Sequence, residues 1–438
     1  MKYVKGAKRV FMDTGTRFPQ KLVWSVALIK REAARANSSL GKLDPRIAAA
    51  IVEASEEVMA GRHDTDVLVD VYQTGSGTGL NMNLNEIIAE KASEILSKKV
   101  HPNDQVNMGQ SSNDVVPSAI RIAAVSLSTG ELAASLVAAT RSLRALAKRT
   151  STTYKAGRTH LRDALPVTMG QEFAAYADAL DHDLVLLRGV LAYVRELPLG
   201  GTAVGTGVGA DPKFASSVIS GINRSTKLDF SRAKSSFRAM RLVSDLVALS
   251  SILNVIAIDI HRLCEDIRLM FSGPLTGFGE IEIPTQEEVP GSSIMPGKTN
   301  PVTVEAAMQV SAQVMGLDKA NQLAGMLGEF ELSMGVPLIG YNVTVQIALL
   351  SEALRKLSSV VLDHITPNQK RAKAYAESSP ALITALSPEI GYDAAAALGK
   401  RLARGLSIRE ALKELRYSDR EIDEILDLRK MVGPNTGS

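Results

Sequence analysis

Four loops of the sequence concentrate hydroxyl, amide and charged side chains, the groups that move protons and bind small anions. The richest is Gly291-Ser-Ser-Ile-Met-Pro-Gly-Lys298-Thr-Asn300, and Pro301 and Glu305 follow it closely. Two serine hydroxyls, an ammonium, an amide and a carboxylate therefore lie between positions 291 and 305. By itself the segment also fits a mobile surface loop. Its groups suit proton abstraction and stabilisation of an enolate-like anion.

Three further loops carry short hydrogen-bond donors ahead of predicted helices. They are the segment from Gln73 to Asn83, the segment from His101 to Asp114 with Ser111, Ser112 and Asn113, and the segment from Gly157 to Asp163 with Thr159 and His160. Taken singly, they also fit an ordinary turn, a helix cap and a structural histidine. Backbone N–H groups and hydroxyls ahead of a helix also bind anions. Four such loops in one chain favour a small polar dicarboxylate as substrate.

The composition argues against several other classes of function. A formal net charge of +3 with 22% charged residues gives no sign of a nucleic-acid-binding face. No secretory signal or uninterrupted apolar span is visible, so we expect a soluble, cytoplasmic protein. The single cysteine, Cys264, reads as a small buried hydrophobe. No two of the 6 histidines have metal-ligand spacing, and we expect no metal and no cofactor.

Long helices are expected to position these loops. Asp44 and Pro45, followed by periodic apolar residues and Gly61, predict a capped amphipathic helix. Longer patterns predict the staves of an extended bundle over 114–149, 165–196, 235–271, 302–325 and 341–363. Their alanine-rich faces favour a homo-oligomer. The glycine- and proline-rich loop 272–301 is long enough to act as a lid, and the tail from Thr366 to Ser438 suggests a small separate domain.

Five motifs, in order, carry a resemblance to a known family. They are Thr74-Gly-Ser-Gly-Thr with Asn81-Met-Asn, Gly109-Gln-Ser-Ser-Asn-Asp, Gly157-Arg-Thr-His, the segment that begins at Gly291, and Leu386-Ser-Pro-Glu-Ile-Gly-Tyr-Asp. From about Val23 to Tyr392 the chain resembles the fumarase/aspartase superfamily and, within it, the class II fumarases.

Three details separate the members of this superfamily. Aspartate ammonia-lyases usually carry Gln where this chain has His160, Ser-Thr-Asn-Asp where it has Ser111 to Asp114, and Ala where it has Gly297. Argininosuccinate and adenylosuccinate lyases usually lack the Thr-Gly-Ser-Gly-Thr segment. In one departure from the class II fumarases, no counterpart of their Tyr-Gly-Ala-Gln-Thr-like segment precedes Lys21.

The resemblance implies an all-α subunit of three domains, expected at 1–109, 110–366 and 367–438. Its central long-helix bundle would form the core of a homotetramer, with each active site assembled from three chains. The implied reaction is the reversible hydration of fumarate to (S)-malate, by proton abstraction and anti elimination of water, without metal or cofactor. The alternatives are an aspartate ammonia-lyase on the same scaffold and a non-catalytic structural protein of the crystallin kind.

The resemblance also implies roles for individual residues. Ser292 corresponds to the base that removes the C3 proton of malate, with Lys298 as its cation, and His160 paired with Glu305 corresponds to the group that handles water. The implied substrate-binding residues are Ser76, Thr78, Ser111, Ser112, Asn113, Thr159, Ser293 and Asn300. A second carboxylate site outside the catalytic pocket corresponds to His101, Asn103 and Asp104.

Overall fold

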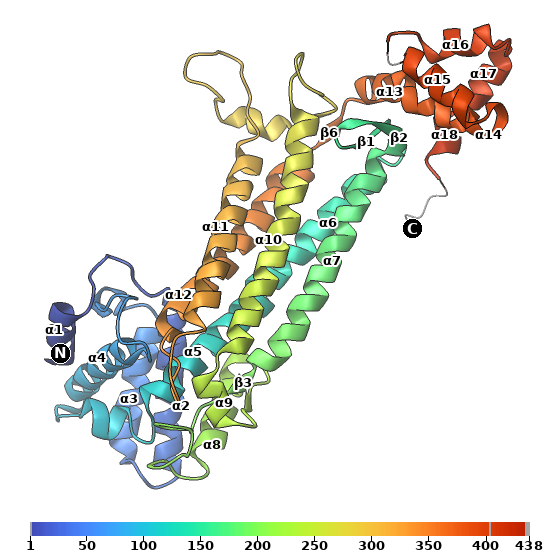
Figure 1. The fold of residues 1–438 in the computed structure, drawn as a ribbon. Coiled ribbons are helices and arrows are strands. Elements are labelled where there is room, and N and C mark those ends of the chain that lie inside the picture. The colour runs from blue at the N-terminus through green and yellow to red at the C-terminus, as the bar shows by residue number, and fades with distance from the viewer. Residues whose placement is uncertain (1, 403, 434–438) are drawn as a thin grey trace. The chain divides into compact units, whose positions relative to one another are not determined.

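The computed structural model describes residues 2–402 and 404–433, and most of them are helical (Figure 1). They separate into two compact units, each made of three stretches of chain. Unit 1 comprises 1–134, 183–258 and 310–352, and unit 2 comprises 135–182, 259–309 and 353–438. The expected all-α class is confirmed. The division at 109/110 and 366/367 stays a prediction, and its outer ends, 1 and 434–438, lie outside the described residues.

Unit 1 contains the helices from the N-terminal part of the chain. Asp44 caps α3 by accepting from the N–H groups of Arg46 and Ile47 at 2.8 and 3.3 Å, which confirms the predicted capped helix. The elements that lie wholly in this unit are α1 (Lys2–Val10), α2 (Gln20–Ser39), α3 (Pro45–Met59), η1 (Asp64–Asp66), α4 (Thr78–Leu96), η2 (Pro102–Val106), α5 (Ser112–Leu127), η3 (Ser128–Leu132), β3 (Glu196–Leu197), α8 (Phe214–Thr226), β4 (Ser231–Arg232) and α9 (Ser236–Arg241).

The N-terminal segment before Lys21, where no counterpart of the family's Tyr-Gly-Ala-Gln-Thr-like segment is visible, begins with the helix α1 of unit 1. The first N–H groups of α1 belong to Tyr3 and Val4, and both donate to the carboxylate of Glu86 on α4, at 2.6 and 3.2 Å. A carboxylate at a helix N-terminus satisfies donors that have no partner inside the helix. A local pattern could not reveal this cap, because the capping carboxylate lies 82 or more residues away in the chain.

Unit 2 contains short strands and the C-terminal helices. Strands β1 and β2 pair antiparallel, as do β5 and β6. Its own elements are β1 (Tyr154–Thr159), β2 (Arg162–Thr168), β5 (Ile281–Glu282), η4 (Pro284–Glu288), η5 (Leu357–Leu362), β6 (Thr366–Pro367), α13 (Gln369–Ser378), η6 (Pro380–Leu386), α14 (Ser387–Ile390), α15 (Tyr392–Leu402), α16 (Ile408–Glu414), α17 (Asp419–Ile425) and α18 (Leu428–Met431). Apolar residues of this tail, from Ala376 to Leu428, form a hydrophobic cluster of their own.

Long helices supply residues to both units. They are α6 (Ala133–Arg149), α7 (Met169–Val194), α10 (Ser244–Phe271), α11 (Val302–Ala324) and α12 (Val336–Lys356). The predicted helix 302–325 is confirmed, and the one predicted over 114–149 appears as α5, η3 and α6 in succession. Two predicted starts are wrong. Residues 165–168 belong to strand β2 rather than to a helix, and α12 begins at Val336 rather than at 341.

The helix predicted over 235–271 is interrupted between α9 and α10. Arg121 of α5 lies at the break: its guanidinium donates to the carbonyl oxygen of Ala239 at 3.2 Å and to both carboxylate oxygens of Asp245 at 2.8 Å. Arg121 is fully buried. The guanidinium therefore binds the Ala239 carbonyl at the end of α9 and the Asp245 carboxylate at the start of α10. A periodic pattern does not reveal this interruption, because the residue that stabilises it lies 118 positions away.

We expect Arg121→Met to lower the free energy of unfolding by about 3–5 kcal/mol, because it leaves the buried Asp245 carboxylate without its partner. Urea unfolding at a fixed protein concentration measures this loss. The matched control is Arg144→Met, which removes a half-exposed arginine paired with Asp178 and Asp181. Exposed pairs contribute about 0–1 kcal/mol. Equal losses in the two variants would contradict the account of Arg121.

A buried polar network in unit 1 fixes the register of three long helices. The Ser250 hydroxyl of α10 lies 2.7 Å from Asp318 of α11 and 3.1 Å from Gln346 of α12, and Asn321 donates to Ser250 at 2.9 Å. These helices run side by side (Figure 1). Because each polar group would be unsatisfied in a shifted register, the network specifies one arrangement.

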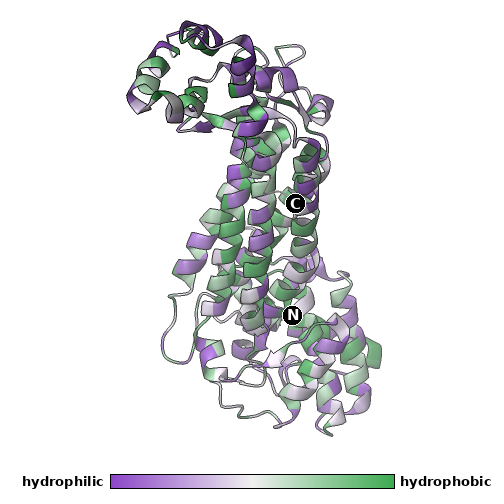
Figure 2. Cartoon of the chain, turned by 90° about the vertical axis from the view of Figure 1, so that its right-hand side faces the viewer, coloured by the Kyte–Doolittle hydropathy of each residue, from purple (hydrophilic) through white to green (hydrophobic). Residues whose placement is uncertain are grey.

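Two helical stretches are notably apolar. Ser112–Arg149 and Ser244–Phe271 are long and apolar enough to cross a membrane by length and composition, a property that core helices of soluble proteins share. In each, 44% of the most apolar window is buried within the chain. Figure 2 shows hydrophobic residues along the long helices, interspersed with hydrophilic ones. Most of the large apolar residues in these stretches are buried within the chain, but Val137, Val255, Ile258 and Leu269 are at least 36% exposed.

Candidate functional site

The loop that begins at Gly291 is closed on itself by hydrogen bonds. The N–H of Gly291 donates to the carbonyl oxygen of Lys298 at 3.0 Å, and the side-chain amide of Asn300 donates to the carbonyl oxygen of Gly291 at 2.7 Å. A Cβ at position 291 would lie 2.3 Å from the Lys298 oxygen, so only glycine fits this closure. The loop therefore holds Ser292, Lys298 and Asn300 in one short turn.

Two backbone donors converge on the Ser292 hydroxyl. Its Oγ accepts from the N–H of Met295 at 3.0 Å and from that of Ile294 at 3.2 Å. Hydrogen bonds to an oxygen favour its charged form, because they stabilise the added electron density. The Lys298 ammonium is exposed and has no ion pair or hydrogen bond among the described residues. Ser293 is also exposed. The loop thus offers a hydroxyl whose oxygen accepts two backbone donors, and it also carries an exposed cation.

Glu305 lies on the first turn of α11, where its N–H donates to the carbonyl oxygen of Pro301 at 3.0 Å. The start of this helix is held by a residue that the sequence reasoning missed. Gln286, which is buried, accepts from the Thr303 N–H at 2.9 Å and donates to the Thr303 hydroxyl at 3.2 Å. A glutamine 17 residues upstream gives no local capping signal. It nevertheless sets where α11, and with it Glu305, begins.

Thr159 and His160 lie at the tip of a β-hairpin rather than in the plain loop expected from the sequence. Strands β1 and β2 are joined by His160 and Leu161, whose φ angles are 54° and 56°. A two-residue turn with both residues at positive φ matches the twist of paired strands, but it usually contains glycine. Non-glycine residues held in this region cost on the order of 1–3 kcal/mol each and concentrate at functional sites. The histidine side chain is exposed.

Ion pairs anchor this hairpin, from Lys155 near its base and from Arg158 near its tip. Arg158 donates to both carboxylate oxygens of the buried Glu280 at 2.9 and 3.0 Å and lies 4.3 Å from the centre of the Phe278 ring. Lys155 donates to Glu172 at 2.8 and 2.9 Å. Burial raises the pKa of Glu172, and Lys155 opposes this shift. The sequence reasoning missed these four charged residues, because their partners lie far apart in the chain.

His160 and Glu305 were expected to act as a pair. Both belong to unit 2. Within the part of the chain that the structure describes, no hydrogen bond or ion pair joins them. The single chain therefore supplies both groups without bringing them into contact.

Ser76 and Thr78 lie at the start of α4 in unit 1, with their hydroxyl oxygens 2.9 Å apart. The predicted start of this helix near Asn83 is wrong, because α4 begins at Thr78. Gly77 adopts a left-handed φ of 77° just before it, and the side chain of Gln73 accepts from the third helical N–H at 2.9 Å. This local chemistry lets the helix begin early and places both hydroxyls at its N-terminus.

Ser111, Ser112 and Asn113 open α5, and they play different parts. Ser111 forms a capping box with Asp114. Ser112 is buried, and its Oγ accepts from the side-chain amide of Asn81 at 3.1 Å. Asn113 donates to the carbonyl oxygen of Ala203 at 2.8 Å. Ser111 thus takes part in a helix cap, whereas Ser112 and Asn113 make contacts that capping does not require.

The three residues of the expected second carboxylate site share one turn. His101 precedes η2, and its Nδ1 lies 3.3 and 3.1 Å from the N–H groups of Asn103 and Asp104. The side chains of Asn103 and Asp104 are exposed. A hollow beside this turn is lined by His101 and Asn103 and also by Lys2, Arg9 and Lys99. Three basic side chains and the carboxylate of Glu86 thus line the hollow beside this turn, and the role of the three expected residues stays a prediction.

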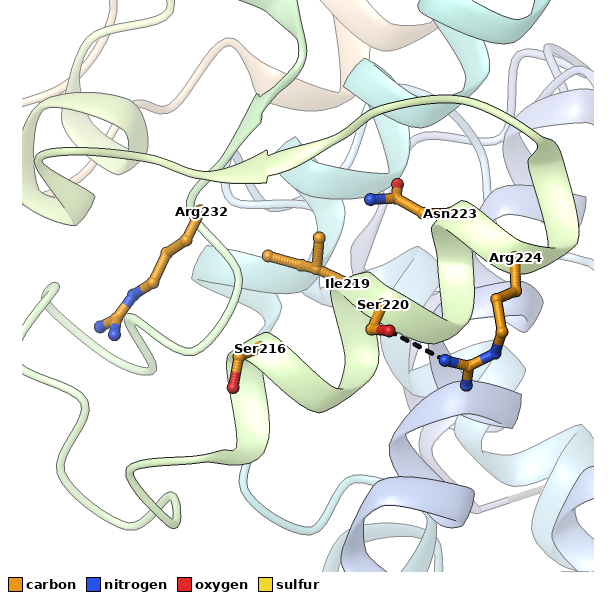
Figure 3. Close-up of a pocket in the computed structure, with 6 residues that line it drawn as sticks. All are labelled: Ser216, Ile219, Ser220, Asn223, Arg224 and Arg232. Carbon is orange, nitrogen blue, oxygen red and sulfur yellow. Dashed lines mark hydrogen bonds between the residues drawn. The ribbon is translucent and has the colours of Figure 1, made fainter.

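Another surface hollow lies between α8 and β4 (Figure 3). Its lining consists of Ser216, Ile219, Ser220, Asn223, Arg224 and Arg232. The Arg224 guanidinium is engaged with the Ser220 hydroxyl at 2.8 Å. The hollow contains no residue of the expected site.

The expected site residues fall into two groups. Unit 1 carries Ser76, Thr78, His101, Asn103, Asp104, Ser111, Ser112 and Asn113, and unit 2 carries Thr159, His160, Ser292, Ser293, Lys298, Asn300 and Glu305. Across 2–402 and 404–433, no three His, Cys, Asp or Glu side chains group in a way that could hold a metal ion. Each group offers hydroxyl and amide donors together with one histidine and one carboxylate, and unit 2 adds the Lys298 cation.

Comparison with known proteins gives concordant matches. The lyase family model matches residues 1–316, and the fumarase C C-terminus model matches 382–433. The chain is 58% identical to the class II fumarate hydratase of Saccharolobus solfataricus over 99% of both chains. It is 44% identical to that of Nitrosomonas europaea, over 96% of this chain and 93% of the relative. A crystal structure of class II fumarase from Schistosoma mansoni superposes with a TM-score of 0.95 at 32% identity, covering 100% of this chain and 96% of the other.

Proposed function

The chain belongs to the class II fumarate hydratases of the lyase family, and on this premise we propose that it catalyses the reversible hydration of fumarate to (S)-malate with Ser292 as its base. The observation that carries the proposal is the environment of the Ser292 oxygen, which accepts two backbone N–H groups on the same loop that carries Lys298, a lysine with no ion pair or hydrogen bond among the described residues. An ordinary serine hydroxyl is too weak a base for carbon acids. Donors and a nearby cation lower that barrier by stabilising the alkoxide.

In the direction from malate to fumarate, Ser292 takes the C3 proton and the electron pair moves into the adjacent carboxylate. The product of this step is a doubly charged aci-carboxylate. Lys298 and Asn300 bind this carboxylate, because an ammonium and an amide donor stabilise the charge that develops there. In hydration, the same serine returns its proton to C3. One short loop thus supplies both the base and the groups that stabilise the negatively charged intermediate.

The other groups bind the substrate and handle water. Ser76, Thr78, Ser111, Ser112 and Asn113 donate to the substrate carboxylate that does not accumulate charge, together with Thr159, and Ser293 adds a hydroxyl at the signature loop. His160, paired with Glu305, protonates the departing C2 hydroxyl so that water leaves. In hydration it takes a proton from the attacking water.

The catalytic assembly is a homotetramer in which one site takes residues from three chains. Two observations support this proposal. Among the described residues no hydrogen bond or ion pair joins His160 to Glu305, which leaves both side chains free to meet groups of another chain. The long helices also leave large apolar side chains uncovered in a single chain, among them Val255 and Ile258 of α10, which are 36% and 48% exposed. Another copy of the bundle covers such faces and brings the separate donor groups together.

The reaction needs no metal and takes place in the cytoplasm. The proposed donor set is complete for an acid–base mechanism: a base, a cation for the intermediate, and a proton-handling histidine. His101, Asn103 and Asp104 form a second carboxylate-binding site outside this set. The hollow beside them is lined by three basic residues against the single carboxylate of Glu86, and this excess of positive charge supports an anion as its ligand.

The function is tested by incubating the purified protein with fumarate and following the loss of its ultraviolet absorbance, with the product identified by NMR. We expect (S)-malate, at a rate that ammonium does not change and that EDTA leaves intact. Formation of aspartate in the presence of ammonium would instead show that the protein is an ammonia-lyase and not a hydratase. Loss of activity on EDTA treatment, restored by a divalent metal, would contradict the metal-free mechanism.

A further inference from the structure

A fully buried lysine, Lys30 of α2, lies behind the Ser112 donor and has no role in the chemistry described above. Its side chain is 0% exposed, and its ammonium donates to the Asn107 Oδ1 at 2.7 Å and to the Gln110 Oε1 at 3.0 Å. Burial lowers the pKa of Lys30 to about 7, and the nearby Asp114 carboxylate opposes this shift. A buried ammonium is costly even when it is hydrogen-bonded, and an apolar side chain of the same length would fill the space without that cost.

A continuous chain of hydrogen bonds leads from this ammonium to Ser112. The Asn107 Oδ1, which accepts from Lys30, also accepts from the side-chain amide of Asn81 at 3.2 Å. The same Asn81 amide nitrogen donates to the Ser112 Oγ at 3.1 Å. Lys30 and Asn81 are almost completely buried, so water does not compete for these bonds.

The direction of every bond in this chain follows from the lysine. An ammonium has donors and no acceptor, so Asn107 must turn its oxygen toward Lys30. The Asn107 amide nitrogen donates to the carbonyl oxygen of Gln110 at 3.1 Å, which fixes the same orientation. Asn81 must then face Asn107 with its nitrogen, and its second N–H reaches Ser112. The Ser112 oxygen acts as an acceptor here, which leaves its own proton to donate to a ligand.

The side-chain oxygen of Asn81 shows that the neighbouring groups force this amide orientation. Its Oδ1 is buried and has no hydrogen-bond partner within the described residues. Turning the amide over would let this oxygen accept from the Ser112 hydroxyl, but it would also bring it against the Asn107 Oδ1. Because Lys30 holds that Asn107 oxygen in place, the amide keeps the orientation that leaves one acceptor unsatisfied.

We propose that Lys30 is a positioning residue that, through Asn107 and Asn81, holds the Ser112 hydroxyl as a donor to the substrate carboxylate. The proposal rests on the proposed function for the identity of that carboxylate. Lys30 does not touch the substrate. Lys30 sets the direction of the hydrogen bond that the Ser112 hydroxyl makes to the substrate.

The test is Lys30→Met, which keeps the length and the apolar stem and removes the ammonium. We expect the KM for fumarate and the Kd for succinate, a non-reacting dicarboxylate, to rise about five- to twentyfold with kcat changed less than about twofold, because the lost hydrogen bond is made equally in the ground and transition states. The matched control is Gln346→Met. It removes an equally buried polar side chain from the network of α10 and α11, and should lower the thermal midpoint without changing either constant.

A double-mutant cycle with Ser112→Ala separates positioning from a general structural effect. Once the Ser112 hydroxyl is gone, Lys30→Met should change KM and Kd by less than about twofold. Unchanged constants in Lys30→Met, or an equal increase with and without the Ser112 hydroxyl, would overturn the proposal. If Lys30→Met does not yield folded protein, Asn81→Leu breaks the same chain one bond later and is judged by the same cycle. A wild-type protein that binds succinate without hydrating fumarate would refute the proposed function, while the Kd values would still decide the role of Lys30.

Discussion

Ser292→Ala should lower kcat for fumarate hydration by about 100- to 10,000-fold, the range typical of losing a general acid or base. The alanine removes the oxygen that accepts the Met295 and Ile294 N–H groups and leaves the loop closure at Gly291 and Asn300 untouched. The variant should therefore still bind succinate with nearly the wild-type Kd. Stopped-flow or steady-state absorbance gives kcat, and calorimetry gives the binding constant.

The control for this variant is Thr299→Ala, which removes a hydroxyl from the same loop that no proposed step uses. We expect it to retain kcat within about threefold of wild type, as most substitutions outside the acting groups do. Near-normal turnover by Ser292→Ala would remove serine as the base. Loss of succinate binding together with turnover would instead indicate that the loop had collapsed.

His160→Asn should lower kcat by about 100-fold or more, because the departing or attacking water then lacks its proton partner. Asparagine is the suitable replacement, since it tolerates the left-handed backbone that His160 adopts, with φ of 54°. The same change should alter the pH dependence of kcat. A slow variant with an unchanged pH profile would count against acid–base action and favour a purely binding role.

Leu161→Asn is the matched control for the hairpin. It changes the neighbouring residue of the same turn, whose φ is 56°, and its side chain is exposed. Asparagine again suits this backbone, so we expect unchanged turnover. A comparable loss of kcat in Leu161→Asn would mean that the turn conformation, and not the imidazole, is what His160→Asn disturbs.

Much of the fold could be predicted from local patterns. The start and end of α3 are marked by nearby residues, namely Asp44, Pro45 and Gly61, and the structure confirms the helix between them. The starts that were wrong depend on distant or unrecognised partners. α4 begins early because Gln73 and the left-handed Gly77 support it, and the break before α10 depends on Arg121. A periodic pattern contains neither kind of information.

The hairpin that carries His160 was missed for a related reason. The two turn residues, His160 and Leu161, both have positive φ angles. Glycine, asparagine and aspartate usually occupy such positions, and neither turn residue is one of these. Pairing of β1 with β2 and the Arg158–Glu280 bond supply what local propensity does not. The sequence therefore indicated a loop at the correct place but could not show that it is held rigidly.

The motifs identified the proposed site residues, but their spacing could not show which neighbouring groups form hydrogen bonds to each of them. The backbone donors to Ser292 arise from the turn geometry of its own loop and cannot be inferred from residue types. Lys30 was not singled out, because a lysine in a helical pattern is usually solvated. Only its burial and the chain through Asn107 and Asn81 separate it from an ordinary surface lysine.

The central claim is that separate donor groups of this chain form one site across subunits. It is tested most directly by mixing unfolded Ser292→Ala and His160→Asn proteins in equal amounts, refolding them together, and measuring fumarate hydration. If the two residues of a site come from different chains, random tetramers should contain some intact sites and show about a quarter of wild-type activity, the product of two independent halves. Mixed tetramers, confirmed by mass spectrometry, that remain as inactive as the parent variants would contradict the account.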